Sequence, residues 1–189
     1  MHKQIGEDFL RGRFDRTEEG IYFPESNLLI GGRFSVNKRG EPVEYSPNLV
    51  VDEGIDYLLS SAIAGGGIST WYIALYTGNV TVLASWTSAT FDAAATEWTS
   101  YTQPGGTTHP IWNKAAVASG AADSFSNKAE FTSTADTQTV YGAALLSTAT
   151  RPTPSSGGTL IAASNFPSPK ALDTAEILDV GYGLTLTPV

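Results

Sequence analysis

The clearest pattern in the chain is a strict alternation of apolar and polar residues near its C-terminal end. The apolar positions are Leu178, Val180, Tyr182, Leu184 and Leu186, with small or polar residues between them. Successive side chains of a β-strand point to opposite faces of its sheet. The segment is therefore predicted to be a strand with one face in a hydrophobic core.

Four further segments have the pattern of strands. Residues 71–76 (WYIALY) form a continuous apolar run, which is typical of a strand buried on both faces. Residues 139–146 and 158–163 are similar. Residues 124–132 alternate, and this places four residues on one predicted face: Phe125, Asn127, Ala129 and Phe131.

One convincing helix is predicted at the start of this β-rich region. Asp52 is a suitable N-cap, and Ile55, Leu58 and Leu59 recur at helical spacing on one face. The run of three glycines at residues 65–67 then ends the helix. Residues 90–95 are predicted to form a short helical turn, with Thr90 as its cap.

Short strands separated by turn residues, together with a short helix, indicate an all-β fold. We expect an immunoglobulin-like or jelly-roll-like β-sandwich with an extended N-terminal arm. The arm is predicted from the charge pattern, because 7 of the 11 basic and 10 of the 19 acidic residues lie within residues 1–53. The expected boundary is near Pro47, which gives an arm of residues 1–47 and a sandwich of residues 48–189.

The arm contains two similar phrases in which an arginine precedes an aromatic residue. They are Arg11-Gly12-Arg13-Phe14 and Gly31-Gly32-Arg33-Phe34. Such phrases are able to dock an extended segment on a partner, or they are simply short strands with a glycine turn. The residues predicted to contact a partner are Arg11, Arg13, Phe14, Tyr22, Phe23, Arg33 and Phe34.

Composition excludes several classes of function. The formal net charge of −8 leaves too few cations for a surface that wraps nucleic acid. The absence of cysteine excludes disulfides and thiolate metal sites. The chain has no apolar run of membrane-spanning length, and its first residues lack the apolar stretch of a secretory signal. We expect a soluble protein with no cofactor.

The sequence contains no specific catalytic motif. His109 lies in a loop before a proline, and the sequence names no partner that would orient its ring. Asp92 and Glu97 are formally a pair of carboxylates for glycoside hydrolysis, but nothing favours them over other pairs. No G-x-S-x-G elbow and no metal-binding spacing occur. The sequence therefore favours a protein that is not an enzyme.

Aromatic residues are concentrated between the predicted strands, at Trp86, Trp98, Tyr101 and Trp112. On the surface, these side chains would stack on a sugar or on a partner protein. The alternative is that they fill the core of the sandwich or cover its open end.

Residues 48–59 (NLVVDEGIDYLL) and 70–78 (TWYIALYTG) resemble the opening of a group of tailed-phage accessory virion proteins, "NLVVNEGLNYLL … TWYIALFTG". The likeness extends through residues 126–131 (SNKAEF) and 140–145 (VYGAAL) to the C-terminal strand. It implies a decoration, neck-collar or tail-associated protein. It also implies localisation in the virion after synthesis in the host cytoplasm, homo-oligomerisation, and contacts with portal, connector, capsid or tail subunits.

Two other functions stay open on the sequence. The first is a tail-fibre or adhesin module that binds a host glycan through the aromatic residues. The second is an enzyme such as a wall hydrolase, for which the sequence supplies no nucleophile–base pair.

Overall fold

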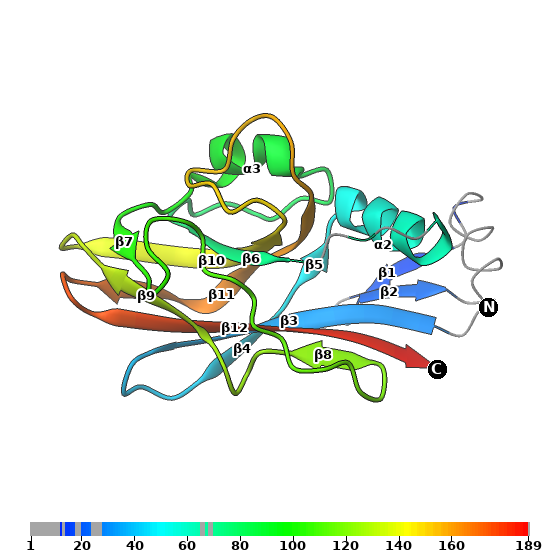
Figure 1. Ribbon diagram of the computed structural model, residues 1–189, viewed down its shortest axis with the longest axis horizontal. Coiled ribbons are helices and arrows are strands. Elements are labelled where there is room, and N and C mark those ends of the chain that lie inside the picture. The colour runs from blue at the N-terminus through cyan, green and yellow to red at the C-terminus, as the bar shows by residue number, and fades with distance from the viewer. Residues whose placement is uncertain are drawn as a thin grey trace.

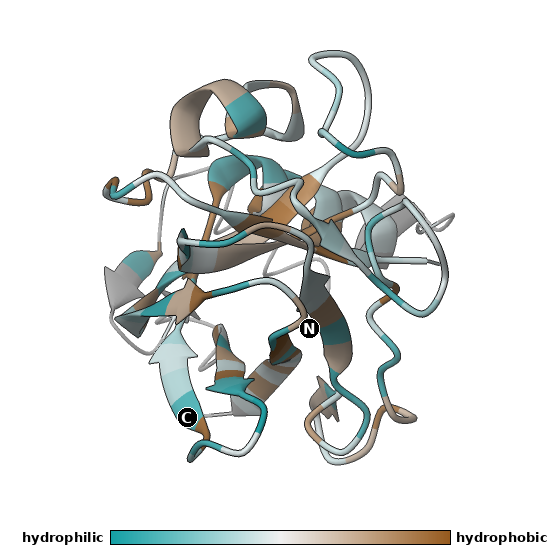
Figure 2. Cartoon of the chain, turned by 90° about the vertical axis from the view of Figure 1, so that its left-hand side faces the viewer, coloured by the Kyte–Doolittle hydropathy of each residue, from teal (hydrophilic) through white to brown (hydrophobic). Residues whose placement is uncertain are grey.

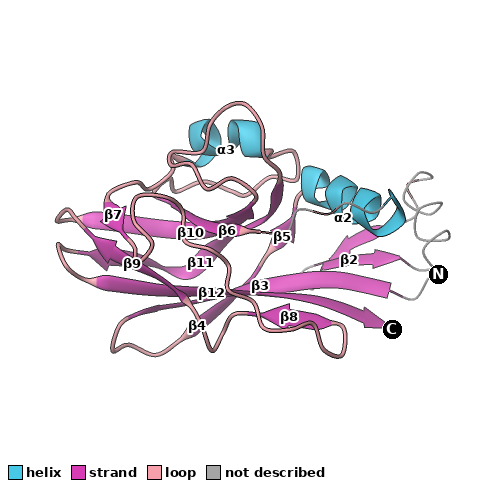
Figure 3. Ribbon diagram, in the orientation of Figure 1, coloured by secondary structure: helices cyan, strands magenta, loops and turns pink. Residues whose placement is uncertain are grey.

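The computed structural model describes residues 12, 14–17, 20–23, 28–64, 67 and 70–188. Strands make up 46% of it and helices 11%, in two sheets and two helices, which confirms the predicted all-β sandwich. The two sheets form successive layers in Figure 1, and Figure 3 separates the strands from the two helices above them.

The larger sheet is built around two long antiparallel strands, β3 (Leu28–Lys38) and β12 (Ile177–Pro188). They pair along their whole length, from Leu178 opposite Lys38 to Pro188 opposite Leu28. Six shorter strands complete the sheet: β1 (Asp15–Thr17), β2 (Gly20–Phe23), β4 (Glu44–Pro47), β7 (Tyr101–Thr102), β8 (Ala121–Asp123) and β9 (Ala129–Ser133).

The smaller sheet has the order β5 (Leu49–Val50), β11 (Leu160–Leu172), β10 (Gln138–Leu146) and β6 (Tyr72–Tyr76). One of its faces packs on the larger sheet, where Ile73, Leu75 and Leu145 meet Phe34 and Val180 in one buried cluster. Apolar residues (brown in Figure 2) are concentrated on the strands, while the loops are mostly pale or teal. The main core therefore lies between the sheets.

The second face of the smaller sheet is buried as well. Tyr76 and Leu146 pack there against Trp86 and Phe91, beneath helix α3 (Ser88–Ala95). This third layer explains why residues 71–76 are apolar at every position, as expected for a strand covered on both sides. Helix α3 begins at the N-cap Thr87, and Thr90 completes its capping box. The predicted helical turn is thus a full helix with its cap three residues earlier.

Helix α2 (Asp52–Ala64) is where the sequence predicted it. Ile55 is buried with Ile21, Ile30 and Val50, so the helix covers the inner face of the larger sheet near the start of β3. Gly54 lies in the first turn, and a Cβ there would overlap the backbone of Ile161 on β11. Glycine lets the helix approach the smaller sheet this closely.

The compositional boundary at residue 47 does not coincide with a structural one. Residues 28–47 form β3 and β4, and β3 lies at the centre of the larger sheet rather than in an appended arm. A turn at Arg39 and Gly40 connects these two strands, with Val36 opposite Glu44. The charges are abundant here because the outer face of this hairpin is exposed to solvent.

Hydrogen bonds to carboxylates fix the turns at one end of the sheets. Hydrogen bonds from the side chain of Thr174 and from its backbone N–H, which donates at 2.9 Å, hold the pKa of Asp136 below its ordinary value. Lys38 Nζ lies 2.6 Å from Glu176 Oε1, which lowers the pKa of Glu176 and raises that of Lys38. The ends of β3, β10 and β12 are joined through these contacts.

Candidate functional site

The outer face of the larger sheet carries the candidate site. Directly opposite residues on antiparallel strands share a face. Arg33 on β3 is opposite both Pro47 on β4 and Gly183 on β12, and Gly183 is opposite Asp123 on β8. These four residues form a row across four strands. Phe34 points to the core, so Arg33 and its row face away from it.

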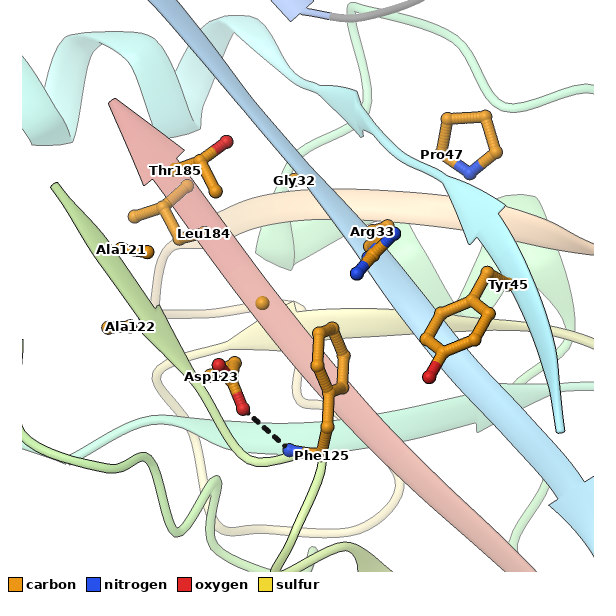
Figure 4. A pocket seen from close by; sticks show the side chains of 11 residues that line it. Gly32, Arg33, Tyr45, Pro47, Ala121, Ala122, Asp123, Phe125, Leu184 and Thr185 are labelled. Atoms are coloured by element: carbon orange, nitrogen blue, oxygen red, sulfur yellow. Dashed lines mark hydrogen bonds between the residues drawn. The ribbon is translucent and has the colours of Figure 1, made fainter. Parts of the chain in front are cut away.

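A groove of about 660 Å³ lies along this row. Strands β4 and β8 form its two sides, and β3 and β12 lie between them (Figure 4). The lining residues are Gly32, Arg33, Tyr45, Pro47, Ala121, Ala122, Asp123, Phe125, Gly183, Leu184 and Thr185. The groove is therefore largely apolar, with one cation and one carboxylate.

Arg33 packs against two aromatic rings, Tyr45 and Phe125, at one end of the groove (Figure 4). Its Cζ atom lies 4.5 Å from the ring centroid of Tyr45 and 5.2 Å from that of Phe125, and the two rings meet edge to face at 5.6 Å. Tyr45 is 47% exposed. No carboxylate within the described part of the chain forms an ion pair with Arg33.

The position of Phe125 depends on a turn and on a glycine. The Phe125 N–H donates to Asp123 Oδ1 at 2.9 Å, which closes a turn directly after β8. The ring then lies over Gly183, where a Cβ would come within 2.7 Å of Phe125 Cζ. Gly183 thus provides the space in which the ring packs against the sheet.

This arrangement is suited to binding rather than to bond cleavage. A guanidinium that packs against aromatic rings keeps its planar edge available for a carboxylate, which it binds through two parallel hydrogen bonds. The described residues that line the groove include no histidine or lysine. The Thr185 hydroxyl donates to the backbone oxygen of Gly31 at 3.3 Å, so it is not paired with a base.

The residues predicted to contact a partner differ in their exposure to solvent. Arg33 is exposed and lines the groove, whereas Phe34 is fully buried in the core, because adjacent residues of a strand face opposite ways. Phe14 is partly buried against the cluster around Ile21. Arg11 and Arg13 lie outside the described residues, as do the side chains of Tyr22 and Phe23.

The predicted surface aromatics are not on the surface. Trp86, Trp98, Tyr101 and Trp112 are all buried, which is the core-filling alternative. Trp98 Nε1 donates to Gln138 Oε1 at 3.2 Å, and Trp112 Nε1 donates to the Tyr182 carbonyl at 2.9 Å. Burial raises the pKa of Tyr101 to about 12. These side chains are therefore not positioned to stack on a glycan.

His109 has an orienting partner that the sequence did not reveal. Its Nε2 lies 2.7 Å from Glu97 Oε1, and its Nδ1 lies 2.9 Å from the Thr148 carbonyl oxygen. The second oxygen of Glu97 accepts the Thr153 N–H at 2.7 Å. Both side chains of the pair have 0% exposure, so a substrate has no access to them. The pair joins three loops rather than forming a catalytic site.

Asp92 and Glu97, the pair of carboxylates considered from the sequence, both accept hydrogen bonds from the backbone. Asp92 Oδ1 accepts the Glu97 N–H at 3.1 Å, at the end of α3. Within the described residues, no group of three or more metal-ligating side chains is positioned to hold a metal ion. None of the helices there is long and apolar enough to cross a membrane.

Comparison of the chain with protein-family models, with curated protein sequences and with solved structures gives no match.

Sequence reasoning missed Tyr45, Phe125 and Asp123 as members of a site. Phe125 was placed on the same face as Ala129 and Phe131, but the turn after β8 breaks the alternation and leaves Phe125 on the outer face. The Asp-Ser-Phe sequence at residues 123–125 is a usable signal, because Asp favours turns of this kind.

Proposed function

We propose that this chain is a structural component of a tailed-phage virion, an accessory head or neck protein of the collar or decoration kind. It joins neighbouring subunits through the groove on the outer face of its larger sheet. It is not an enzyme. The observation that carries this proposal is the cluster of exposed Arg33 and Tyr45 with half-buried Phe125, set on a rigid four-stranded surface.

Arginine and tyrosine are among the residues that contribute most to binding at protein interfaces. Here their side chains are already packed together, so little rotamer entropy is left to lose on association. The resemblance of residues 48–187 to accessory virion proteins supports the same function. Burial of Glu97 and His109 removes the most plausible acid–base pair from contact with a substrate.

The glycan-binding alternative has lost its original support. It depended on exposed tryptophans, and Trp86, Trp98 and Trp112 are buried. One face of the exposed Tyr45 ring is occupied by Arg33, which leaves less aromatic surface for a sugar. Particle assembly is therefore the function that the described surface supports best.

The test is incorporation of groove variants into particles. The double variant Arg33→Ala, Tyr45→Ala should fold normally and be incorporated at least about tenfold less than the parent chain, since interface residues of this type contribute more than 1 kcal/mol each. Quantitative immunoblotting of purified particles measures the copy number. Leu83→Ala is the matched control, because Leu83 is 53% exposed and lies outside the groove. Normal incorporation of the double variant, or absence of the parent chain from particles, contradicts the proposal.

A further inference from the structure

The two sides of the groove carry opposite charges with apolar surface between them. Arg33 lies on β3 and Asp123 on β8, and both are opposite Gly183 on the strand between them. Two strand spacings of about 4.8 Å separate the backbones of the two charged residues by roughly 10 Å. Tyr45 and Phe125 supply the aromatic surface of the groove. An occupant therefore needs an acidic group, apolar side chains and a basic group, in that order.

One segment of this chain has that order of chemistry. Residues 7–11 read Glu-Asp-Phe-Leu-Arg and lie outside the described residues. Successive side chains of an extended chain point to opposite faces, so Glu7, Phe9 and Arg11 face the same side. Glu7 and Arg11 are four residues apart, which corresponds to about 13 Å in an extended chain and is long enough to reach both charged residues of the groove. Phe9 lies between them.

We propose that residues 7–11 of a neighbouring copy of this chain occupy the groove. The carboxylate of Glu7 binds Arg33, and Arg11 binds Asp123. Phe9 packs on the rings that flank Arg33. This inference rests on the proposed assembly function and identifies which segment performs it.

The same copy's segment does not reach the groove easily. Asp15 on β1 is four strands from Asp123, and the row of Asp15 meets β12 at Thr187, four residues from Gly183. These offsets amount to about 23 Å. The residues from Arg11 to Asp15 span at most about 14 Å when fully extended, and Gly12 among them has a φ of 65°, which is not extended. The same copy would need the full length of the Arg11 and Asp123 side chains to cover the rest, whereas a second copy approaches the groove without this restriction.

Photo-crosslinking of the full chain tests the contact directly. A chain with p-benzoylphenylalanine in place of Phe9 is prepared in unlabelled and ¹⁵N-labelled forms, which are mixed and irradiated. Crosslinks to peptides containing Tyr45 or Phe125 are expected. Crosslinks that join an unlabelled chain to a ¹⁵N-labelled chain should occur as often as random pairing of the two forms predicts, because the contact is between two copies. Crosslinks only within one isotope, crosslinks elsewhere on the chain, or no crosslinks at high protein concentration overturn the inference.

A charge exchange tests the pairing. Arg33→Glu should weaken self-association in sedimentation experiments by about tenfold or more, the usual effect of losing a charge-assisted hydrogen bond. Adding Glu7→Arg to the same chain should restore it. Lys114→Glu carries the same change of charge at an exposed residue outside the groove and should have little effect. Failure of the Arg33→Glu, Glu7→Arg variant to recover association overturns the pairing.

The two proposals fail in different ways. If Arg33→Ala, Tyr45→Ala is excluded from particles but Phe9 crosslinks elsewhere, the groove binds another partner and only the assignment of residues 7–11 is wrong. If that double variant is incorporated normally, the assembly function of the groove is wrong as well.

Discussion

The hydrogen bonds of His109 define where its protons are. The Thr148 carbonyl only accepts, so His109 Nδ1 must carry a hydrogen. The other ring nitrogen faces Glu97 Oε1, and a carboxylate also only accepts. One further proton must therefore lie between Nε2 and Oε1. The buried pair is neutral as a whole, which is how two ionisable groups are accommodated in the core.

Two substitutions of Glu97 should have very different effects. Glu97→Ala leaves His109 Nε2 and the Thr153 N–H without partners and should lower the free energy of unfolding by about 4 kcal/mol. In Glu97→Gln, the amide oxygen still accepts from Thr153 and the amide nitrogen donates to neutral His109. That variant should lose less than about 1.5 kcal/mol. Urea denaturation measures both, with exposed Asp56→Ala as a control; equal losses in the two Glu97 variants contradict the assignment.

At the residue scale, the sequence predicted the burial of a side chain correctly where the two-residue repeat of a β-strand alone decides which face the side chain is on. The alternation along β12 correctly placed Leu178, Val180 and Tyr182 in the core. Leu186 follows the same alternation but is 41% exposed, because β12 continues past the smaller sheet that would cover it. The partner of His109 could not be predicted, since Glu97 reaches it only when two loops fold together.

At the element scale, the contact between α2 and β11 depends on a single glycine. Gly54 lies in a helix, where glycine is ordinarily unfavourable relative to alanine. Here the backbone of Ile161 occupies the space that a side chain would need. The helix position is therefore determined by close backbone packing as well as by the apolar face that includes Ile55.

Gly54→Ala should consequently destabilise the protein, against the usual effect of this substitution in helices. We expect a loss of about 3 kcal/mol, because the nearest obstacle is backbone rather than a movable side chain. Ser60→Ala on the exposed part of the same helix should change stability by less than about 0.5 kcal/mol. Thermal and urea unfolding measure both, and a Gly54→Ala chain as stable as the parent would falsify this account.

The elements themselves were largely predictable, whereas the groove was not. Helix α2 and strands β6, β10 and β12 each have a local pattern that identifies them. The groove requires Arg33, Pro47, Asp123 and Gly183 to come into one row, and pairing between distant strands creates that row. No local pattern specifies such pairing, so the site becomes visible only in the folded chain.

At the scale of the whole molecule, the N-terminal third is not separable from the sandwich. Strand β3 contributes Phe34 and Val36 to the main core and pairs with β12 along its length. Only the first residues of the chain precede the described strands. A segment that acts as an assembly arm is therefore much shorter than residues 1–47.

Two truncations separate these roles. Removal of residues 1–11 should leave the unfolding transition within a few degrees of the parent chain while abolishing self-association. Removal of residues 1–47 leaves the edge of β12 unpaired and takes Phe34 and Val36 out of the core, so it should leave a chain that has no cooperative unfolding transition. Circular dichroism and sedimentation measure these outcomes. A stable, cooperatively folded chain after removal of residues 1–47 contradicts the central position of β3.

The pairing of β3 with β12 also has a consequence for the order of events during synthesis. Residues 28–38 leave the ribosome early, but their partner strand at residues 177–188 is made much later. Until β12 has been made, β3 lacks the neighbouring strand with which it forms the centre of the larger sheet. Contacts between such distant segments form slowly, and an unpaired strand with an apolar face is prone to aggregate. The chain therefore gains its outward-facing groove only after residues 177–188 have been made, so a subunit becomes competent to bind its neighbours only from that point.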